Sequence, residues 1–321
     1  AALLSTTGIF IRYLTRSYGI PALVLALWRD AFVVLTLLPI LALVRPLLLQ
    51  PGRRHLLFLL GYGFVLAVFN ALWTVSVVLN GAAIATVLVY SSAAFSVLLG
   101  WLFLRESLHL AKLAALAFAL GGCLLVSGAL DRFSWHLISP SEPVGVLIGL
   151  LSGLSYALYS LLGRSAALRG LSPWTTLVYI FGFAGIFLLL ANLSAGGLLP
   201  ATAARPAELF WLGRAWGGWA MLFLLAAGPT VAGFGLYNIS LGYLPSSMAN
   251  LIVTSEPALT AVTAYFVLGE RMDPMQIGGG VMILAGVVFL RVSEGRRGLR
   301  IGRPAWNRPG AASKSRAPHA A

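Results

Sequence analysis

The sequence predicts an all-α membrane protein with ten transmembrane helices, arranged as two inverted five-helix repeats around a central cavity. Three observations lead to this fold class. Of the 321 residues, 59% are hydrophobic and 10% are charged, and the mean hydropathy is +0.91, so the chain cannot build a water-soluble surface. Apolar stretches of roughly 20 residues, the length that crosses a bilayer, follow one another almost end to end. The second half of the chain repeats the pattern of the first.

Charges, prolines and glycines bound the predicted helices. The first repeat, residues 1–130, holds five spans, near residues 2–18, 22–44, 54–79, 82–104 and 108–128. A polar connecting loop follows at residues 131–143. The second repeat, residues 144–294, holds five more, near residues 144–168, 173–195, 216–242, 246–268 and 274–293. The chain opens on an apolar run without a cleavage-site pattern, which we interpret as a trimmed first span rather than a signal peptide.

The net charge of +13 does not indicate a nucleic-acid partner, because most of it lies in one tail. From Arg291 onward, eight Lys or Arg residues stand against a single acid, Glu294. No basic fold with interleaved aromatic residues precedes them. We interpret residues 295–321 as a basic, disordered cytoplasmic tail that contacts anionic lipid, and we expect no nucleic-acid binding.

Positive charge also predicts the orientation in the membrane, because loops rich in Lys and Arg stay in the cytoplasm. The basic residues that flank one set of connections are Arg45, Arg53, Arg54, Arg105, Lys112, Arg164 and Arg169. The tail falls on that same side. The connections on the opposite side also contain several Arg residues, so the short loops alone favour this orientation only weakly. The basic tail determines the predicted orientation. Both termini are predicted to be cytoplasmic.

The internal repeat appears when the chain is slid along itself. At an offset of 164 residues, Glu106 falls on Glu270, and at an offset of 152, Arg12 falls on Arg164. Each half holds five helices, an odd number, so the second half enters the membrane from the opposite side. Many secondary transporters are built from such inverted repeats, with substrate bound near the midplane. Duplication as a route to a stable bundle is the alternative interpretation.

The second half carries the signature that resembles the drug/metabolite transporter superfamily, the EamA-type fold of two five-helix repeats. The resembling segments are Ser255-Glu256-Pro257-Ala258-Leu259, Leu268-Gly269-Glu270-Arg271 and Gly278 to Gly286. In the first half, Phe10-Ile11-Arg12-Tyr13-Leu14 and Trp28-Arg29-Asp30 are similar to bacterial YddG-type exporters of aromatic and other neutral amino acids. The resemblance implies a multi-pass protein of the bacterial inner (plasma) membrane that exports small metabolites.

A polar stripe recurs in both halves and is predicted to line the cavity. Steps of four, seven and four residues place its members on one face of the span at 82–104, and offset 164 repeats them on the span at 246–268. The polar or aromatic members are Thr86, Tyr90, Trp101, Asn250, Thr254 and Tyr265. Polar stripes in lipid must face protein or water. The alternative is that the hydroxyls bond backbone carbonyls and the aromatics pack between helices.

Further aromatic and amide side chains join this predicted substrate site. They are Asn70, Trp73, Tyr156, Tyr159, Tyr237 and Asn238. Such side chains offer stacking surface and a few hydrogen bonds to an amphiphilic solute. The aromatic residues at segment ends, including Trp211, Trp216 and Trp219, fit an interfacial belt instead.

Two positions place ionisable groups at depth. Glu256, followed by Pro257, is included in the predicted site because it can bind a substrate ammonium or a proton; the equal alternative is a neutral acid that stabilises the proline distortion. Arg29 and Asp30 could meet a substrate carboxylate, but they point about 100° apart on a helix, so we interpret them as structural. Glu106 and Glu270, beside basic residues at helix junctions, are interpreted as gate or packing salt bridges.

The sequence lacks the common catalytic motifs that would indicate an enzyme. The sequence holds no Walker motif, GxSxG elbow, HExxH motif or paired cysteine site, and Cys123 is its single cysteine. We predict no enzyme, no cofactor and no metal, but a secondary transporter for small amphiphilic metabolites, most of all amino acids including aromatic ones. The alternatives are a carrier of drugs or nucleotide sugars, or a membrane scaffold that transports nothing, which a lipid-facing Trp101 and Tyr265 would favour.

Overall fold

The computed structural model describes residues 1–92, 95, 98–99, 110–126, 141–195, 201–243, 253 and 256–298. Within these ranges every regular element is helical, as the sequence predicts. The first half contains α1 (Ala2–Tyr18), α2 (Ala22–Val44), α3 (Arg53–Asn80), α4 (Ala82–Val89) and α6 (Leu110–Val126). The second half contains α7 (Ser141–Leu168), α8 (Pro173–Ala195), α9 (Trp216–Leu225), α10 (Phe234–Tyr243), α12 (Glu256–Leu268) and α13 (Pro274–Gly298).

Short elements complete the chain. Two 3₁₀ turns, Pro46–Leu49 and Pro206–Phe210, form part of the connections after α2 and α8. A π-helical segment, η3 (Ala226–Gly233), joins α9 to α10 without a break, so the three elements make one apolar rod. Pro229 lies inside this segment and has no N–H to donate, which favours the wider π-helical turn.

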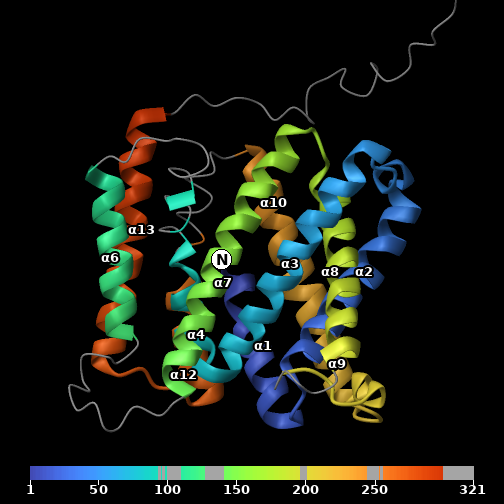
Figure 1. Ribbon diagram of the computed structural model, residues 1–321, viewed down its shortest axis with the longest axis horizontal. Coiled ribbons are helices and arrows are strands. Elements are labelled where there is room, and N and C mark those ends of the chain that lie inside the picture. The colour runs from blue at the N-terminus through green and yellow to red at the C-terminus, as the bar shows by residue number, and fades with distance from the viewer. Residues whose placement is uncertain are drawn as a thin grey trace, which may run out of the picture.

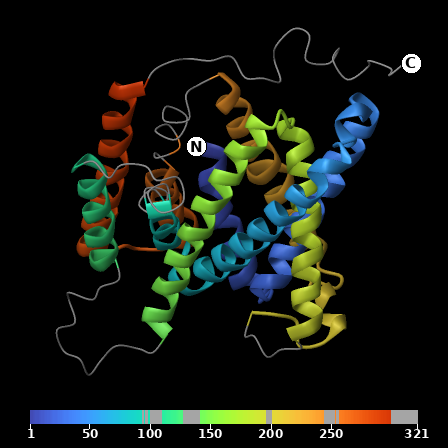
Figure 2. The same ribbon diagram turned by 45° about the horizontal axis from the view of Figure 1, so that its top comes forward.

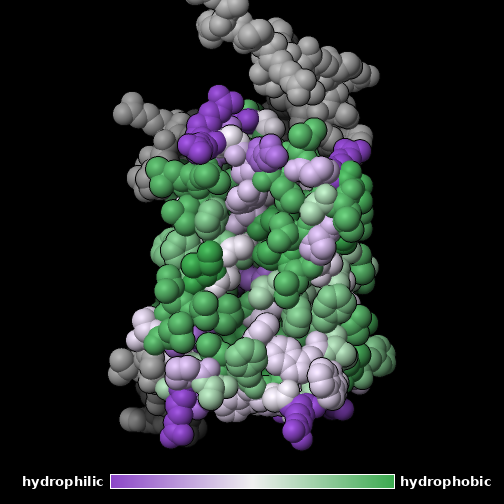
Figure 3. Space-filling model, turned by 90° about the vertical axis from the view of Figure 1, so that its right-hand side faces the viewer, coloured by the Kyte–Doolittle hydropathy of each residue, from purple (hydrophilic) through white to green (hydrophobic). Residues whose placement is uncertain are grey.

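Five of the described helices are long and apolar enough to cross a membrane. They are Ala22–Val44, Arg53–Asn80, Pro143–Leu168, Pro173–Ser194 and the rod Trp216–Tyr237. Figure 3 shows a broad hydrophobic band over the face it draws, with hydrophilic residues gathered at its two ends. This pattern is typical of a multi-pass membrane protein, in which lipid surrounds the middle of the bundle.

The predicted boundaries agree closely with most of these helices, since α8 begins at residue 173 and ends at residue 195 as expected. Two of the ten predicted spans, 82–104 and 246–268, lie partly outside the described residues. Two boundaries are wrong. The helix α7 already begins at Ser141, inside the predicted loop, and α13 continues to Gly298, beyond the predicted start of the tail at residue 295.

The helices stand roughly side by side, and the last helix of each half lies at one edge of the bundle. The helices α6 and α13 form a pair on the left of Figure 1 and of Figure 2. The other helices pack against one another, and the largest buried apolar cluster is made from them. This arrangement leaves the interior of the bundle to α1–α4, α7, α8, the α9–α10 rod and α12.

Glycines let neighbouring helices approach closely. Gly145, Gly149 and Gly153 lie along α7, and a methyl group added at these positions would meet Asn80, Leu88 or Ser91 of the first half. This row of glycines is therefore a packing stripe between α7 and the first half. A close seam also joins α6 to α13, where a methyl group on Gly122 would lie 2.6 Å from the backbone oxygen of Gly279.

Gly122→Ala is expected to lower the melting temperature of the detergent-solubilised protein by several degrees, because the backbone of α13 has to move away, at a cost of about 1–3 kcal/mol. The matched control is Gly61→Ala in α3, where a methyl group would meet nothing within 4 Å. Alanine favours a helix more than glycine does, so this control should melt no lower than the wild type. Equal melting temperatures for the two variants would contradict the close α6–α13 seam.

Candidate functional site

A cavity lies in the interior of the bundle, lined by both halves of the chain. Its volume is about 50 Å³, which holds a few waters or a small polar group. Nine elements contribute to its wall: α1, α2, α3, α4, α7, α8, η3, α10 and α12. The lining residues are Leu4, Thr7, Arg29, Phe69, Asn70, Trp73, Val89, Tyr90, Tyr156, Phe181, Thr230, Phe234, Tyr237 and Glu256.

The adjacent residues Arg29 and Asp30 of α2 have separate surroundings. Asp30 is fully buried, and both of its carboxylate oxygens accept hydrogen bonds from the amide of Asn70 on α3, at 2.9 and 2.8 Å. Arg29 lines the cavity, with its Nε 3.5 Å from Asp30 Oδ1. The carboxylate therefore ties α2 to α3, while the guanidinium faces the cavity, contrary to the purely structural role expected for both residues.

Tyr90 reaches across the cavity from the end of α4. The backbone N–H groups of Tyr90 and Ser91 donate to carbonyls three residues earlier, at 3.1 and 3.0 Å, so the helix tightens here. The Tyr90 hydroxyl lies 2.7 Å from the carbonyl oxygen of Val253 and 3.1 Å from Glu256 Oε2. These contacts join the first half to the second at the wall of the cavity.

An aromatic wall on α3 and α7 backs one side of the cavity. The rings of Tyr156 and Tyr159 stack with centroids 6.0 Å apart, and Phe69 lies 5.2 Å from Tyr156. Behind them, the Tyr62 ring is 5.1 Å from that of Tyr159. Offset or tilted aromatic packing of this kind holds each ring in place. Tyr156 thus faces the cavity from a supported position.

The structure brings six of the predicted site residues together at the cavity and leaves others away from it. The six are Asn70, Trp73, Tyr90, Tyr156, Tyr237 and Glu256. Tyr159 is buried in the aromatic wall beside Tyr156 but does not line the cavity. The Thr86 hydroxyl donates to the carbonyl of Ala82 in its own helix at 2.8 Å, which is the alternative that the sequence left open.

Tyr265 does not line the cavity, and half of its side chain is exposed. The reason is helix geometry, since nine residues of an α-helix amount to about 900°, which places Tyr265 on the opposite side of α12 from Glu256. Three predicted residues, Trp101, Asn250 and Thr254, lie outside the described residues. For Asn238 the structure describes the backbone in α10 but not the side chain.

Sequence reasoning left out eight of the lining residues: Leu4, Thr7, Arg29, Phe69, Val89, Phe181, Thr230 and Phe234. Thr230 had a detectable signal, because Pro229 stands next to it inside an apolar span. The π-helical turn puts Thr230 on the cavity side, with its hydroxyl donating to the Leu225 carbonyl at 2.9 Å. The apolar residues carried no such signal, since they resemble any core-facing side chain.

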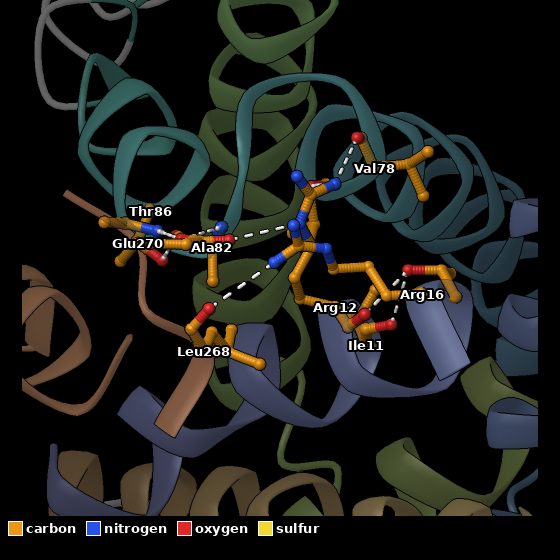
Figure 4. A network of polar contacts seen from close by, with 11 residues as sticks. Ile11, Arg12, Arg16, Val78, Ala82, Thr86, Leu268 and Glu270 are labelled. Atoms are coloured by element: carbon orange, nitrogen blue, oxygen red, sulfur yellow. Dashed lines mark hydrogen bonds and ion pairs between the residues drawn. The ribbon is translucent and has the colours of Figure 1, made fainter. Parts of the chain in front are cut away.

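A second polar cluster lies where α1, α3 and α12 end, and we call it the latch (Figure 4). Arg12 of α1 forms an ion pair with Glu270, with 3.1 Å between Nε and Oε1. The same carboxylate accepts from the backbone N–H of Ala82 at 3.0 Å, at the start of α4. Glu270 therefore joins the connection between α12 and α13 to two helices of the first half.

Arg12 and Arg16 bind backbone carbonyls as well as the acid. Arg12 Nη1 donates to the carbonyl of Val78 near the end of α3, and Arg16 Nη1 lies 3.4 Å from that of Leu268 at the end of α12. The orphan carbonyls and amides of three helix ends are thus satisfied by one acid and two guanidinium groups. The sequence interpretation of Glu270 as part of a salt bridge holds, but its partner is Arg12.

Comparisons with known proteins agree with this architecture. The model of the EamA-like transporter family matches residues 1–128 and 143–292. An uncharacterized transporter of Archaeoglobus fulgidus is 28% identical over 228 residues, which cover 70% of this chain and 74% of that protein. A probable terminal-alkyne amino-acid exporter of Streptantibioticus cattleyicolor is 27% identical over 226 residues, which cover 66% and 65%. One crystal structure shares the fold, with a TM-score of 0.57 and 16% identity over 92% of this chain and 97% of that one.

The latch should appear as an energetic coupling between its two charged members. In a double-mutant cycle of Arg12→Gln and Glu270→Gln, thermal unfolding in detergent should give a coupling of about 1 kcal/mol, because each single variant leaves the other charge partly buried without its partner. Arg16→Gln, which changes an exposed side chain, is the control and should couple to Glu270→Gln by less. Strictly additive effects of Arg12→Gln and Glu270→Gln would contradict the ion pair.

Proposed function

Because this chain belongs to the EamA-like transporter family, we propose that it exports small amphiphilic metabolites, amino acids including aromatic ones, by alternating access. Members of this family are membrane transporters rather than enzymes. The observation that carries the substrate proposal is the cavity, whose wall combines aromatic rings with single amide, hydroxyl and charged groups. A wall of this composition suits a solute with both apolar surface and polar ends.

The charge of the cavity favours an amino acid over more acidic solutes. A nucleotide sugar carries phosphates, which call for several basic side chains. Within the described lining, Arg29 is the one basic residue, and Glu256 contributes the opposite charge. One relative is named a probable terminal-alkyne amino-acid exporter. That name describes the relative, and its similarity to this chain adds support to the amino-acid proposal.

The proposed site keeps the residues predicted from the sequence that the cavity brings together, and adds Thr7 and Arg29. Trp101, Asn238, Asn250 and Thr254 remain proposed members on the strength of the repeat. Tyr265 is left out, because it lies half-exposed on the far side of α12. A half-exposed Tyr265 fits the scaffold alternative as well, but membership of a transporter family argues against a scaffold.

The proposed transport cycle rests on two inverted five-helix repeats that rock against each other. The latch supports this, because Glu270 belongs to the second half and its partners Arg12 and Ala82 to the first. With both termini in the cytoplasm of a bacterial cell, α1, α3 and α12 all end at the outer side of the inner membrane. We therefore assign the latch to the outer gate, which is closed when the ion pair is formed.

In proteoliposomes, the purified protein should move labelled L-phenylalanine or L-threonine. Tyr90→Ala should lower the initial rate roughly 10-fold or more at equal incorporation, because it removes aromatic surface and a hydroxyl from the cavity wall. Trp219→Ala is the matched control, since Trp219 packs at the edge of the bundle with its ring 4.9 Å from that of Trp28. Absence of flux across a broad amino-acid panel would overturn the substrate proposal, and equal rates for the two variants would overturn the site.

A further inference from the structure

Two buried polar groups at the cavity lack the hydrogen bonds that a water-free interior normally requires. Arg29 Nε and Nη2, and Thr7 Oγ1, have no hydrogen-bond partner among the described residues, although Arg29 Nε lies 3.5 Å from Asp30 Oδ1. Both side chains line the cavity, and Arg29 is only 3% exposed. Buried donors without partners cost free energy and therefore need an explanation.

The missing bond of Thr7 is unusual within this molecule. The hydroxyls of Thr15, Thr36, Thr74 and Thr86 all donate to carbonyls three or four residues earlier in their own helices. Thr7 has the same opportunity in α1 but does not use it. Its hydroxyl is held where a ligand in the cavity can accept its hydrogen.

Asp30 balances the charge of Arg29 without occupying its donors. Both carboxylate oxygens of Asp30 already accept from Asn70 at less than 3 Å, while Arg29 Nε remains 3.5 Å away. Asp30 thus lowers the cost of burying the guanidinium and leaves its planar fork open. A guanidinium fork matches a carboxylate, which can accept two parallel hydrogen bonds.

Glu256 supplies the opposite charge from the other half of the chain. Its described polar contact is with the Tyr90 hydroxyl, whose single hydrogen has a nearer acceptor in the Val253 carbonyl, at 2.7 against 3.1 Å. One hydrogen cannot serve both acceptors fully. The carboxylate therefore keeps acceptor capacity toward a cation in the cavity.

From this pairing we infer that the cavity recognises free α-amino acids as zwitterions. Arg29 and Thr7 bind the α-carboxylate, Glu256 binds the α-ammonium, and the aromatic wall contacts the side chain. The inference rests on the proposed function and deepens it, because it assigns each charged end of the substrate to a residue. The site should accordingly reject amides, esters and amines that lack the carboxylate, and acids that lack the ammonium.

The test compares three competitors against transport of labelled L-phenylalanine in proteoliposomes. L-phenylalaninamide lacks the carboxylate charge, and 3-phenylpropionate lacks the ammonium. With the wild type, unlabelled L-phenylalanine should inhibit at a concentration on the order of 10- to 100-fold lower than either analogue, because each analogue leaves one buried charge unpaired. If L-threonine is the better substrate, its amide and its deaminated acid replace these analogues.

Arg29→Gln should weaken inhibition by unlabelled L-phenylalanine by a similar factor. It should change inhibition by L-phenylalaninamide less than about 3-fold. Glu256→Gln should likewise weaken inhibition by L-phenylalanine, but it should spare inhibition by 3-phenylpropionate. Relative to Arg29→Gln, Arg29→Lys should restore part of the affinity for L-phenylalanine. This reciprocity separates recognition from a structural role, which would weaken all three competitors together. Equal losses for all three, or equal inhibition of the wild type by L-phenylalanine and its amide, would overturn the inference alone.

Thr7→Val provides a second variant in case Arg29→Gln does not fold. It replaces an unpartnered buried hydroxyl by a methyl group, so the melting temperature should stay the same or rise. Affinity for L-phenylalanine should still fall roughly 3- to 10-fold, whereas the control Thr36→Val should leave it unchanged. Unchanged affinity in Thr7→Val would overturn the role of Thr7. A wild type that moves no amino acid would instead overturn the proposed function, and the zwitterion site with it.

Discussion

The absence of water from the membrane interior is the constraint on which the rest of the structure depends. Each polar group at depth needs a partner within the protein, and the described helices meet this requirement almost everywhere. Threonine hydroxyls bond to their own helices, and Asn70 serves both oxygens of Asp30. Against this background, few buried side-chain atoms of the described residues lack a hydrogen bond, and three of the five, Thr7 Oγ1 and two nitrogens of Arg29, lie at the central cavity. The same rule that makes the bundle stable therefore supports the proposed ligand site.

Apolar length and helix-breaking residues were enough to predict most of the fold. A span of about 20 apolar residues between prolines, glycines or charges leaves few alternatives to a transmembrane helix. This is why α8 begins and ends as predicted. The boundaries that were wrong lie at polar ends, where Ser141 and Gly298 continue a helix beyond the apolar stretch. Hydropathy does not predict such extensions, because a helix can continue through polar residues beyond the end of its apolar span.

The candidate site was only partly predictable, because residue type does not decide which way a side chain faces. Tyr265 and Glu256 were both selected from α12, although nine residues put them on opposite sides of a helix. Arg29 and Asp30 were both interpreted as structural, whereas Asp30 alone is tied to another helix, by Asn70, which lies 40 residues further along the chain and donates to both oxygens of that acid. The partner of Glu270 is likewise Arg12, at the other end of the sequence. Such contacts depend on tertiary packing, which no local pattern records.

Glu270 also bears on the equilibrium between states of the transporter that are closed and open at the outer end. A partly exposed ion pair is worth about 1 kcal/mol, which changes an equilibrium roughly 5-fold rather than locking it. The closed outer end would then be favoured but not fixed, and a modest preference of a bound solute for one state would be enough to reverse the balance. A single carboxylate at the rim of the bundle would thereby bias the resting population of a carrier whose proposed binding site lies in its interior.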